Sequence, residues 1–289
     1  MPATAVRLPA RGVLRLTGPD MRAFLQGLVT NDVARADDAH AIYAALLTAQ
    51  GKYLFDFFLV GEDEDLLLEG EGARLGDLVQ RLKLYKLRAK VDIADLSGTH
   101  QVWAVLGDEA AAALALNSAP GAARGYEGGV AFIDPRLAAM GARLILPGDT
   151  TPAFAEAGEG AYERLRLCLG LPDGGRDIDV ERSLILEANI EPLNGVDFTK
   201  GCYVGQELTA RMKHRGKVRK RLVPVAIGGE APPPGAPILS HGREVGVMKS
   251  AYEKRGLALL RLDDLDKAPF SCAGATLMPD IPDWLAPFL

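Results

Sequence analysis

Asp197-Phe-Thr-Lys-Gly-Cys-Tyr-Val-Gly-Gln-Glu-Leu-Thr-Ala-Arg211 is the stretch from which the organisation of this chain is best derived. Gly201 and Gly205 flank Cys202, and glycines let the backbone take tight or left-handed turns. The residues after Gly205 are compatible with a helix, so Cys202 is expected just before a helix N-terminus. The free N–H groups there favour an anion such as a thiolate, and Lys200 would add to this effect. Cys202, assisted by Lys200, is therefore the candidate reactive thiol.

A buried structural role is the alternative for this cysteine, because free cysteines often act as small apolar side chains. Cys168 lies in an apolar stretch and is expected in the core, and Cys272 carries no functional signal. One thiol cannot hold an iron–sulfur cluster, so a metal role of Cys202 requires further ligands from a partner. Thiol exchange or redox chemistry requires none. The sequence leaves both possibilities open.

The basic residues that follow this thiol stand out from an acidic chain. The 289 residues carry a net charge of -5, whereas residues 200–221 contain eight Lys or Arg and one acid, which gives this segment +7. A basic island of this kind indicates a local anion site and argues against a nucleic-acid-binding protein. A solvated basic strand and turn is the alternative for Lys217 to Arg221.

Composition places the chain among ordinary globular proteins of two or three domains. Hydrophobic residues make up 48% and charged residues 25%. No apolar run approaches the roughly 20 residues of a membrane helix, and residues 1–11 lack the apolar core of a secretory signal. Three scattered cysteines argue against a disulfide framework. We therefore expect a soluble, intracellular protein.

Hydrophobic periodicity predicts an α+β unit over residues 1–95. Residues 13–16 alternate like a strand, and a helix with Asp20 as its N-cap follows. The further expected elements are strands at 43–48, 53–60 and 66–69, a helix at 74–87 and a strand at 91–93.

The same order of elements then recurs, which predicts a second, related α+β domain over residues 96–216. Strands are expected at 101–106, 130–133 and 142–146, with helices at 109–116 and within 151–169. This prediction includes the possibility that segments of the two domains are interleaved along the chain. Short strands with Gly and Pro punctuation over residues 217–289 predict a small β-barrel, followed by a tail that packs Trp284 onto the body.

The stretch Lys200-Gly-Cys-Tyr-Val-Gly-Gln-Glu207 resembles the signature of YgfZ-type folate-binding proteins and of the related mitochondrial iron–sulfur assembly factor. The resemblance extends over essentially the whole chain. Further matching blocks are Leu16-Thr-Gly-Pro-Asp20, Phe24-Leu-Gln-Gly27, Thr30-Asn-Asp-Val33, Gly51-Lys-Tyr-Leu-Phe-Asp56, Tyr85-Lys-Leu-Arg88, Leu186-Glu-Ala-Asn189 and Val245-Gly-Val-Met-Lys-Ser250.

The resemblance implies the fold of the glycine cleavage T-protein, with two α+β domains around a central channel and a C-terminal β-barrel. It also implies tetrahydrofolate binding and a role in maturing iron–sulfur proteins, especially the four-iron class. The cluster would be shared transiently with a partner, for which an A-type iron–sulfur carrier protein is the candidate. We expect a monomer when alone, located in the cytoplasm of a bacterium or in the mitochondrial matrix of a eukaryote.

The folate site can be assigned by the same resemblance. Glu187 matches the glutamate that holds the pterin ring in T-proteins, and a carboxylate suits the amidine-like N–H edge of a pterin. The anionic folate tail would pair with a cation, and an aromatic side chain would stack on the ring. The other candidates are Asn189, Lys52, Arg88, Arg211, Tyr85, Asp56 and Asn31, the last either lining the channel or serving a turn.

Two other folate-dependent activities are built on this fold. In aminomethyltransferases of the T-protein type, adjacent acids follow a Gly-Gly turn, whereas here Phe55 precedes Asp56. Asp56 remains a candidate general base, with a structural role as the alternative. T-proteins also lack the Lys-Gly-Cys signature, which disfavours transfer chemistry. Nothing indicates the flavin site of a demethylase or oxidase.

Overall fold

The first sheet grows from the apolar segments between residues 11 and 95. In the computed structural model, which describes residues 2–289, five strands lie in the order β3-β4-β5-β2-β6. Their bounds are Arg11–Thr17 (β2), Ile42–Leu47 (β3), Tyr53–Glu62 (β4), Asp65–Glu71 (β5) and Asp92–Asp95 (β6). Neighbouring strands are antiparallel, and β4 is buried along nearly its whole length because both sheet faces are covered.

Two helices cover one face of this sheet. The helices α1 (Met21–Gln26) and α2 (Leu75–Lys86) bury Leu25, Leu78 and Leu82 against the sheet residues of the same core cluster. Asp20 is the N-cap residue of α1, as expected, but its carboxylate accepts a hydrogen bond from the backbone N–H of Lys90 at 2.8 Å and makes no capping bond to the helix. The predicted N-cap position is therefore confirmed, while the side chain of Asp20 links the loop after α2 to the start of α1.

The second sheet packs against the other face of the first. Its strands lie in the order β11-β1-β7-β10-β9-β8, and inward-facing residues of both sheets, such as Phe58 and Phe132, share one core. The bounds are Thr4–Arg7 (β1), His100–Leu106 (β7), Ala123–Tyr126 (β8), Gly129–Ile133 (β9), Ala142–Pro147 (β10) and Ala155–Glu156 (β11). Strand β1 precedes the first sheet in the chain but pairs with β7 and β11, so the N-terminal strand belongs to the second sheet.

The expected helix at 109–116 is much shorter in the structure. Helix α3 spans Ala110–Ala113, and Ala115 adopts a φ of +50°, which ends the helix. The remaining helices are α4 (Glu159–Leu169), α5 (Gly174–Asp177) and α6 (Gln206–Arg215). Short 3₁₀ helices are η1 (Val33–Arg35), η2 (Gly72–Arg74), η3 (Ala138–Met140), η4 (Leu262–Lys267) and η5 (Ala286–Phe288).

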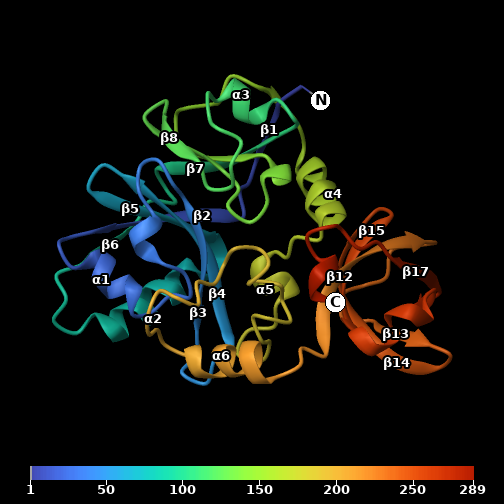
Figure 1. The fold of residues 1–289 in the computed structure, drawn as a ribbon. Helices are drawn as coiled ribbons and strands as arrows, with labels where there is room; N and C mark the ends of the chain where they lie inside the picture. The colour runs from blue at the N-terminus through green and yellow to red at the C-terminus, as the bar shows by residue number, and fades with distance from the viewer. Residues whose placement is uncertain (1) are drawn as a thin grey trace.

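The C-terminal strands close into a six-stranded barrel in the order β12-β15-β14-β13-β16-β17 (Figure 1). They span Lys220–Gly228 (β12), Pro237–Ser240 (β13), Arg243–Tyr252 (β14), Arg255–Arg261 (β15), Phe270–Cys272 (β16) and Ala275–Pro279 (β17). Helix α4 bridges the second sheet and the barrel, and Trp284 donates a hydrogen bond to the carbonyl of Leu169 at 2.9 Å. The predicted class, two α+β units and a small β-barrel, is confirmed. Among residues 2–289, every helix is too short or too polar to cross a bilayer.

Candidate functional site

The loop that carries Cys202 is shaped by its two glycines. Gly201 and Gly205 have φ angles of +97° and +82°, in the region that favours glycine. A Cβ on Gly205 would lie 2.3 Å from the carbonyl oxygen of Thr48, and one on Gly51 would lie 2.8 Å from the carbonyl oxygen of Gly205. The loop therefore rests directly on the turn between β3 and β4. Helix α6 then begins at Gln206, as expected from the sequence.

Lys200 anchors this loop to the end of α1. Its ammonium donates hydrogen bonds to the carbonyl oxygens of Gln26 at 2.7 Å and Val29 at 2.5 Å. It also lies 5.3 Å from the ring centroid of Tyr203. Burial lowers the pKa of Lys200 from 10.5 to about 8, although Asp32 opposes the shift. The side chain satisfies carbonyls that the helix leaves free, so the contacts of Lys200 are those of a positioning residue.

Cys202 itself is exposed to solvent, whereas Cys272 is buried and Cys168 is half-buried. Phe198, which precedes it in the same segment, is 38% exposed and lies 5.7 Å from the ammonium of Lys213 on α6. Within the described residues, no three His, Cys, Asp or Glu side chains are grouped so that they could hold a metal ion. The thiol is therefore open to another molecule, on a surface with an aromatic ring and cations.

Glu187 is the candidate pterin ligand whose surroundings fit that role. Its side chain is half-buried, and burial raises its pKa, while Lys220, Lys52 and Arg221 act in the opposite direction. Within residues 2–289 its carboxylate receives no hydrogen bond and forms no ion pair. The structure thus brings the predicted residues Glu187 and Lys52 together and adds Lys220. Sequence reasoning counted Lys220 in the basic island but did not assign it to this site.

The two asparagines proposed for the site use their side chains within the protein. Asn31 is buried and donates to the carbonyl oxygens of Tyr43 at 2.7 Å and Asn194 at 2.8 Å. Asn189 is buried, has a φ of +61° and donates to the carbonyl of Leu222 at 2.7 Å. Asn31 also lines a cavity of about 310 Å³. Both side chains hold the backbone that surrounds the site.

Asp56 is enclosed by two tyrosines. Its carboxylate oxygens accept hydrogen bonds from the hydroxyls of Tyr43 at 2.8 Å and Tyr53 at 2.5 Å. Burial and the neighbouring carboxylate raise the pKa of both tyrosines well above the usual value, so they remain protonated donors. Both carboxylate oxygens are thus engaged within the protein.

The three remaining candidates lie on α6 or at the end of α2. Arg211 is exposed on α6, and Arg88 is exposed just beyond the end of α2. Tyr85 is half-buried and packs against the core under α2. The structure therefore places Tyr85 on α2 and Arg88 just beyond it, apart from the segments that carry Glu187 and Lys52.

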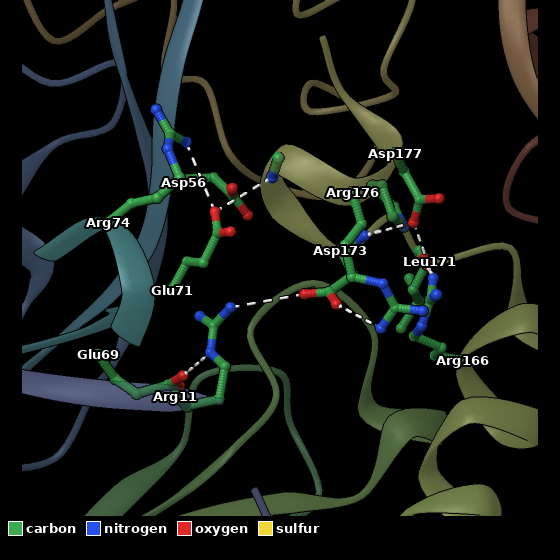
Figure 2. A network of polar contacts seen from close by, with 12 residues as sticks. Arg11, Asp56, Glu69, Glu71, Arg74, Arg166, Leu171, Asp173, Arg176 and Asp177 are labelled. Carbon is green, nitrogen blue, oxygen red and sulfur yellow. Dashed lines mark hydrogen bonds and ion pairs between the residues drawn. The ribbon is translucent and has the colours of Figure 1, made fainter. Parts of the chain in front are cut away.

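A chain of buried charges that the sequence analysis did not assign fills the space between the two sheets. Arg143 donates hydrogen bonds to Glu69 at 3.0 Å and to Asp134 at 3.3 Å. Asp134 also accepts a hydrogen bond from Arg136 at 2.8 Å. Arg11 forms a second ion pair with Glu69 (Figure 2). These charges are nearly or fully buried, and each has an opposite charge beside it. The sequence does contain a sign of this network, because the acidic residue Glu69 interrupts the apolar run of β5.

A second buried group joins α4 to the barrel. Arg166 donates to Asp177 at 2.9 Å and to the hydroxyl of Ser250 at 3.1 Å, and Ser250 donates to Asp177 at 2.6 Å. Figure 2 shows Arg166 and Asp177 facing each other beside Asp173. Because Ser250 lies on β14, this group fixes the barrel against the α+β body.

Comparisons with known proteins agree with this architecture. Residues 219–287 match the family described as CAF17, C-terminal beta-barrel domain. The structure superposes on the glycine cleavage system aminomethyltransferase T from Bartonella henselae with a TM-score of 0.78 over 100% of this chain and 86% of that one. Sequence identity in that comparison is 16%, so it shows the fold, which is the T-protein fold expected from the sequence.

Two relatives share much more of the sequence. The mitochondrial iron-sulfur cluster assembly factor IBA57 of Homo sapiens is 38% identical, covering 96% of this chain and 84% of the human protein. The protein of the same name from Mus musculus is 37% identical, with 97% and 85% covered. Both are described as mitochondrial, in agreement with the location expected for a eukaryotic member. The chain belongs to the family of the iron–sulfur cluster assembly factor IBA57.

Proposed function

We propose that this protein assists the assembly of iron–sulfur proteins and that Cys202 is its working thiol. The observation that carries the proposal is the exposed Cys202 on a loop held in place by Gly205 and Lys200. The fixed loop presents the thiol without enclosing it. The names of the human and mouse relatives support the assembly role.

The iron–sulfur cluster is cargo in this proposal, shared with a partner that supplies the other ligands. A cluster normally requires about four ligands, and Cys202 offers one. We propose an A-type iron–sulfur carrier as the partner and four-iron enzymes as the final recipients. Phe198 and Lys213, next to the thiol-bearing loop, offer an apolar and a positively charged contact. Aromatic and basic side chains of this kind are common anchors in protein interfaces.

We further propose that tetrahydrofolate binds at Glu187. Its carboxylate has no partner in the described residues and would accept two hydrogen bonds from the N–H edge of the pterin. Lys52 and Lys220 would keep it ionised and offer charge to the anionic tail. Lys52 follows Gly51, which touches Gly205, so the folate site and the thiol loop meet at the same β-turn.

Aminomethyl transfer is less well supported by the geometry. Phe55 occupies the position of one T-protein acid, and it packs under the guanidinium of Arg74 at 4.3 Å. The neighbouring Asp56 has both carboxylate oxygens engaged by tyrosine hydroxyls. A general base must reach the proton that it removes, and Asp56 is held away from that task. A test with a lipoylated carrier protein and tetrahydrofolate would reveal transfer activity.

The working-thiol proposal is tested by Cys202→Ala in cells that lack the native protein. We expect loss of aconitase activity, a four-iron readout, with Cys168→Ala as the matched control that retains it. Full aconitase activity with Cys202→Ala would refute the role of this thiol. In vitro, the purified protein mixed with a cluster-loaded A-type carrier should show a cluster absorbance that depends on Cys202.

The folate proposal has a separate test. Calorimetry with tetrahydrofolate should show at least a tenfold loss of affinity in Glu187→Ala, because a bidentate charged contact is removed. Glu230→Ala, an exposed acid on the barrel, is the control and should bind like the parent protein. Equal affinity for both variants would show that the pterin binds elsewhere.

A further inference from the structure

Two leucines at the end of α2 are unusually exposed. Leu84 is 70% and Leu87 is 89% exposed, more than any other large apolar residue among residues 2–289. Leu84 lies in the last turn of α2, and Leu87 is the C-cap residue directly beyond the helix. Leu87 also adopts φ +44° and ψ -106°, which is strained for a leucine. Leu87 therefore combines a strained backbone, which lowers stability, with an apolar side chain that is exposed to solvent.

A cavity begins beside these leucines. It has a volume of about 370 Å³ and lies between β4, α2 and residues 180–181, with Leu84 at its edge. Arg74 lines it, stacked at 4.3 Å on the ring of Phe55, and donates one hydrogen bond to the carbonyl of Leu54 at 2.8 Å. Its other terminal nitrogen, Nη1, is buried and makes no hydrogen bond, although the Glu71 carboxylate lies 3.5 Å away.

The ion pair with Glu71 balances the charge of Arg74, but a buried N–H without a hydrogen bond is costly and favours an acceptor with better geometry. Arg81, on the same cavity wall, is only loosely paired, with Glu181 at 3.9 Å. Arginine binds carboxylates in a planar, two-pronged geometry. Asp77 and Glu181 line the same cavity, so an incoming carboxylate competes with them there and meets unpaired cations only at the end of α2.

The surface around the leucines is positively charged. Residues 83–90 contain four cations and no acid, whereas the whole chain has a net charge of -5. Lys86 lies 3.6 Å from Asp92, and within residues 2–289 the side chains of Lys83 and Arg88 have no ion pair. A second copy of the same surface would be repelled by these charges. A partner with carboxylates around an apolar side chain would be attracted.

We propose that the end of α2 and the adjoining cavity form a docking surface for the partner protein that reaches Cys202, and that the partner contributes acidic side chains and an apolar anchor. This inference rests on the proposed function. The β3–β4 region connects the two places, since Leu54 lines the cavity and Gly51 touches the thiol loop. Helices α2 and α6 both lie toward the lower edge of Figure 1.

Binding of an A-type carrier, with and without its cluster, to variants of the full chain tests the proposal by calorimetry. Leu84→Asp combined with Leu87→Asp should weaken binding by about tenfold or more, since buried apolar anchors dominate interface energies. Met278→Asp, a 48% exposed residue on the barrel, is the matched control and should bind like the parent chain. Leu87→Gly should melt at the same or a higher temperature and still bind more weakly, which separates docking from folding.

The outcomes separate this inference from the proposed function. Parent-level binding by the α2 variants, together with a Cys202-dependent cluster, overturns the docking surface and leaves the thiol role intact. Weakened binding by the α2 variants without any Cys202-dependent cluster supports the docking surface and overturns the thiol role. Absence of carrier binding to the parent chain overturns both.

Discussion

Polar groups in the interior between the two sheets are paired with one another, whereas polar groups near the thiol loop are left without partners. In the interior, Glu69, Asp134 and Arg143 are buried, and each lies against an opposite charge. Near the surface, the thiol of Cys202 is exposed and the carboxylate of Glu187 has no hydrogen-bond partner among residues 2–289. A paired buried charge has its bonding capacity used, so it maintains the fold. Groups left without partners on a rigid frame are those that a ligand or a second protein can engage.

The largest expected effect comes from breaking the interior network. Arg143→Met would leave Glu69 and Asp134 each with one fewer partner in a site without water access. Removing one member of a buried ion pair costs about 3–5 kcal/mol. Urea denaturation should show this loss in the free energy of unfolding.

Arg164→Met is the control for that experiment. Arg164 pairs with Glu253 at 2.8 Å, but both side chains are about half exposed. Exposed pairs contribute about 0–1 kcal/mol, so this variant should unfold almost like the parent. Equal losses for the two variants would contradict the assignment of the interior charges to stability.

The second effect concerns the two glycines of the thiol loop. Gly205→Ala should cost about 2–3 kcal/mol, because the new Cβ would meet the carbonyl of Thr48 in addition to the left-handed backbone strain. Gly201→Ala has open space around its Cβ and should cost about 1 kcal/mol from strain alone. Thermal denaturation compares the two. If Gly201→Ala were the more damaging, the contact with the β3–β4 turn would not be what fixes the loop.

Local pattern predicted much of this fold. Helix α6 begins where the residues after Gly205 become helix-compatible, and the expected barrel strands are present, because both follow from turn residues and apolar periodicity. Strand β1 was not predicted, since its pairing with β7 joins residues about a hundred positions apart. Contacts at that range depend on how whole sheets pack.

Site residues could be predicted where the chemistry of the side chain determines its role. They could not be predicted where packing determines the direction in which the side chain points. Glu187 and Lys52 were singled out from the sequence, and the structure places them close enough for their charges to interact. Lys200 was read as an aid to the thiol, yet its ammonium is directed at the carbonyls of Gln26 and Val29. A sequence shows that a lysine lies two residues from a cysteine, but not which way its side chain turns.

A smaller effect is expected from Lys200→Met, which would leave two carbonyl oxygens without their donor. The expected loss is about 1–2 kcal/mol. The folded-state pKa of about 8 lies below the ordinary 10.5, so the unfolded chain binds more protons between these values. The Lys200 contribution to stability therefore rises with pH across that window, and the gap between parent and variant should widen from pH 8 to 10. A gap that narrows would contradict the buried position of this amine.

The smallest effect has the opposite sign and returns to the unpaired carboxylate. Burial raises the pKa of Glu187, so the folded state binds more protons than the unfolded state just above pH 4.5. Its contribution to stability is therefore present at low pH and is lost as the pH rises through the folded-state pKa. At pH 7 the free energy of unfolding of Glu187→Gln should exceed that of the parent chain by up to about 1 kcal/mol. At pH 4 this difference in the free energy of unfolding should be smaller. Chemical denaturation at the two pH values measures this difference, and a glutamine variant that is less stable at pH 7 would mean that Glu187 serves the fold and not a ligand.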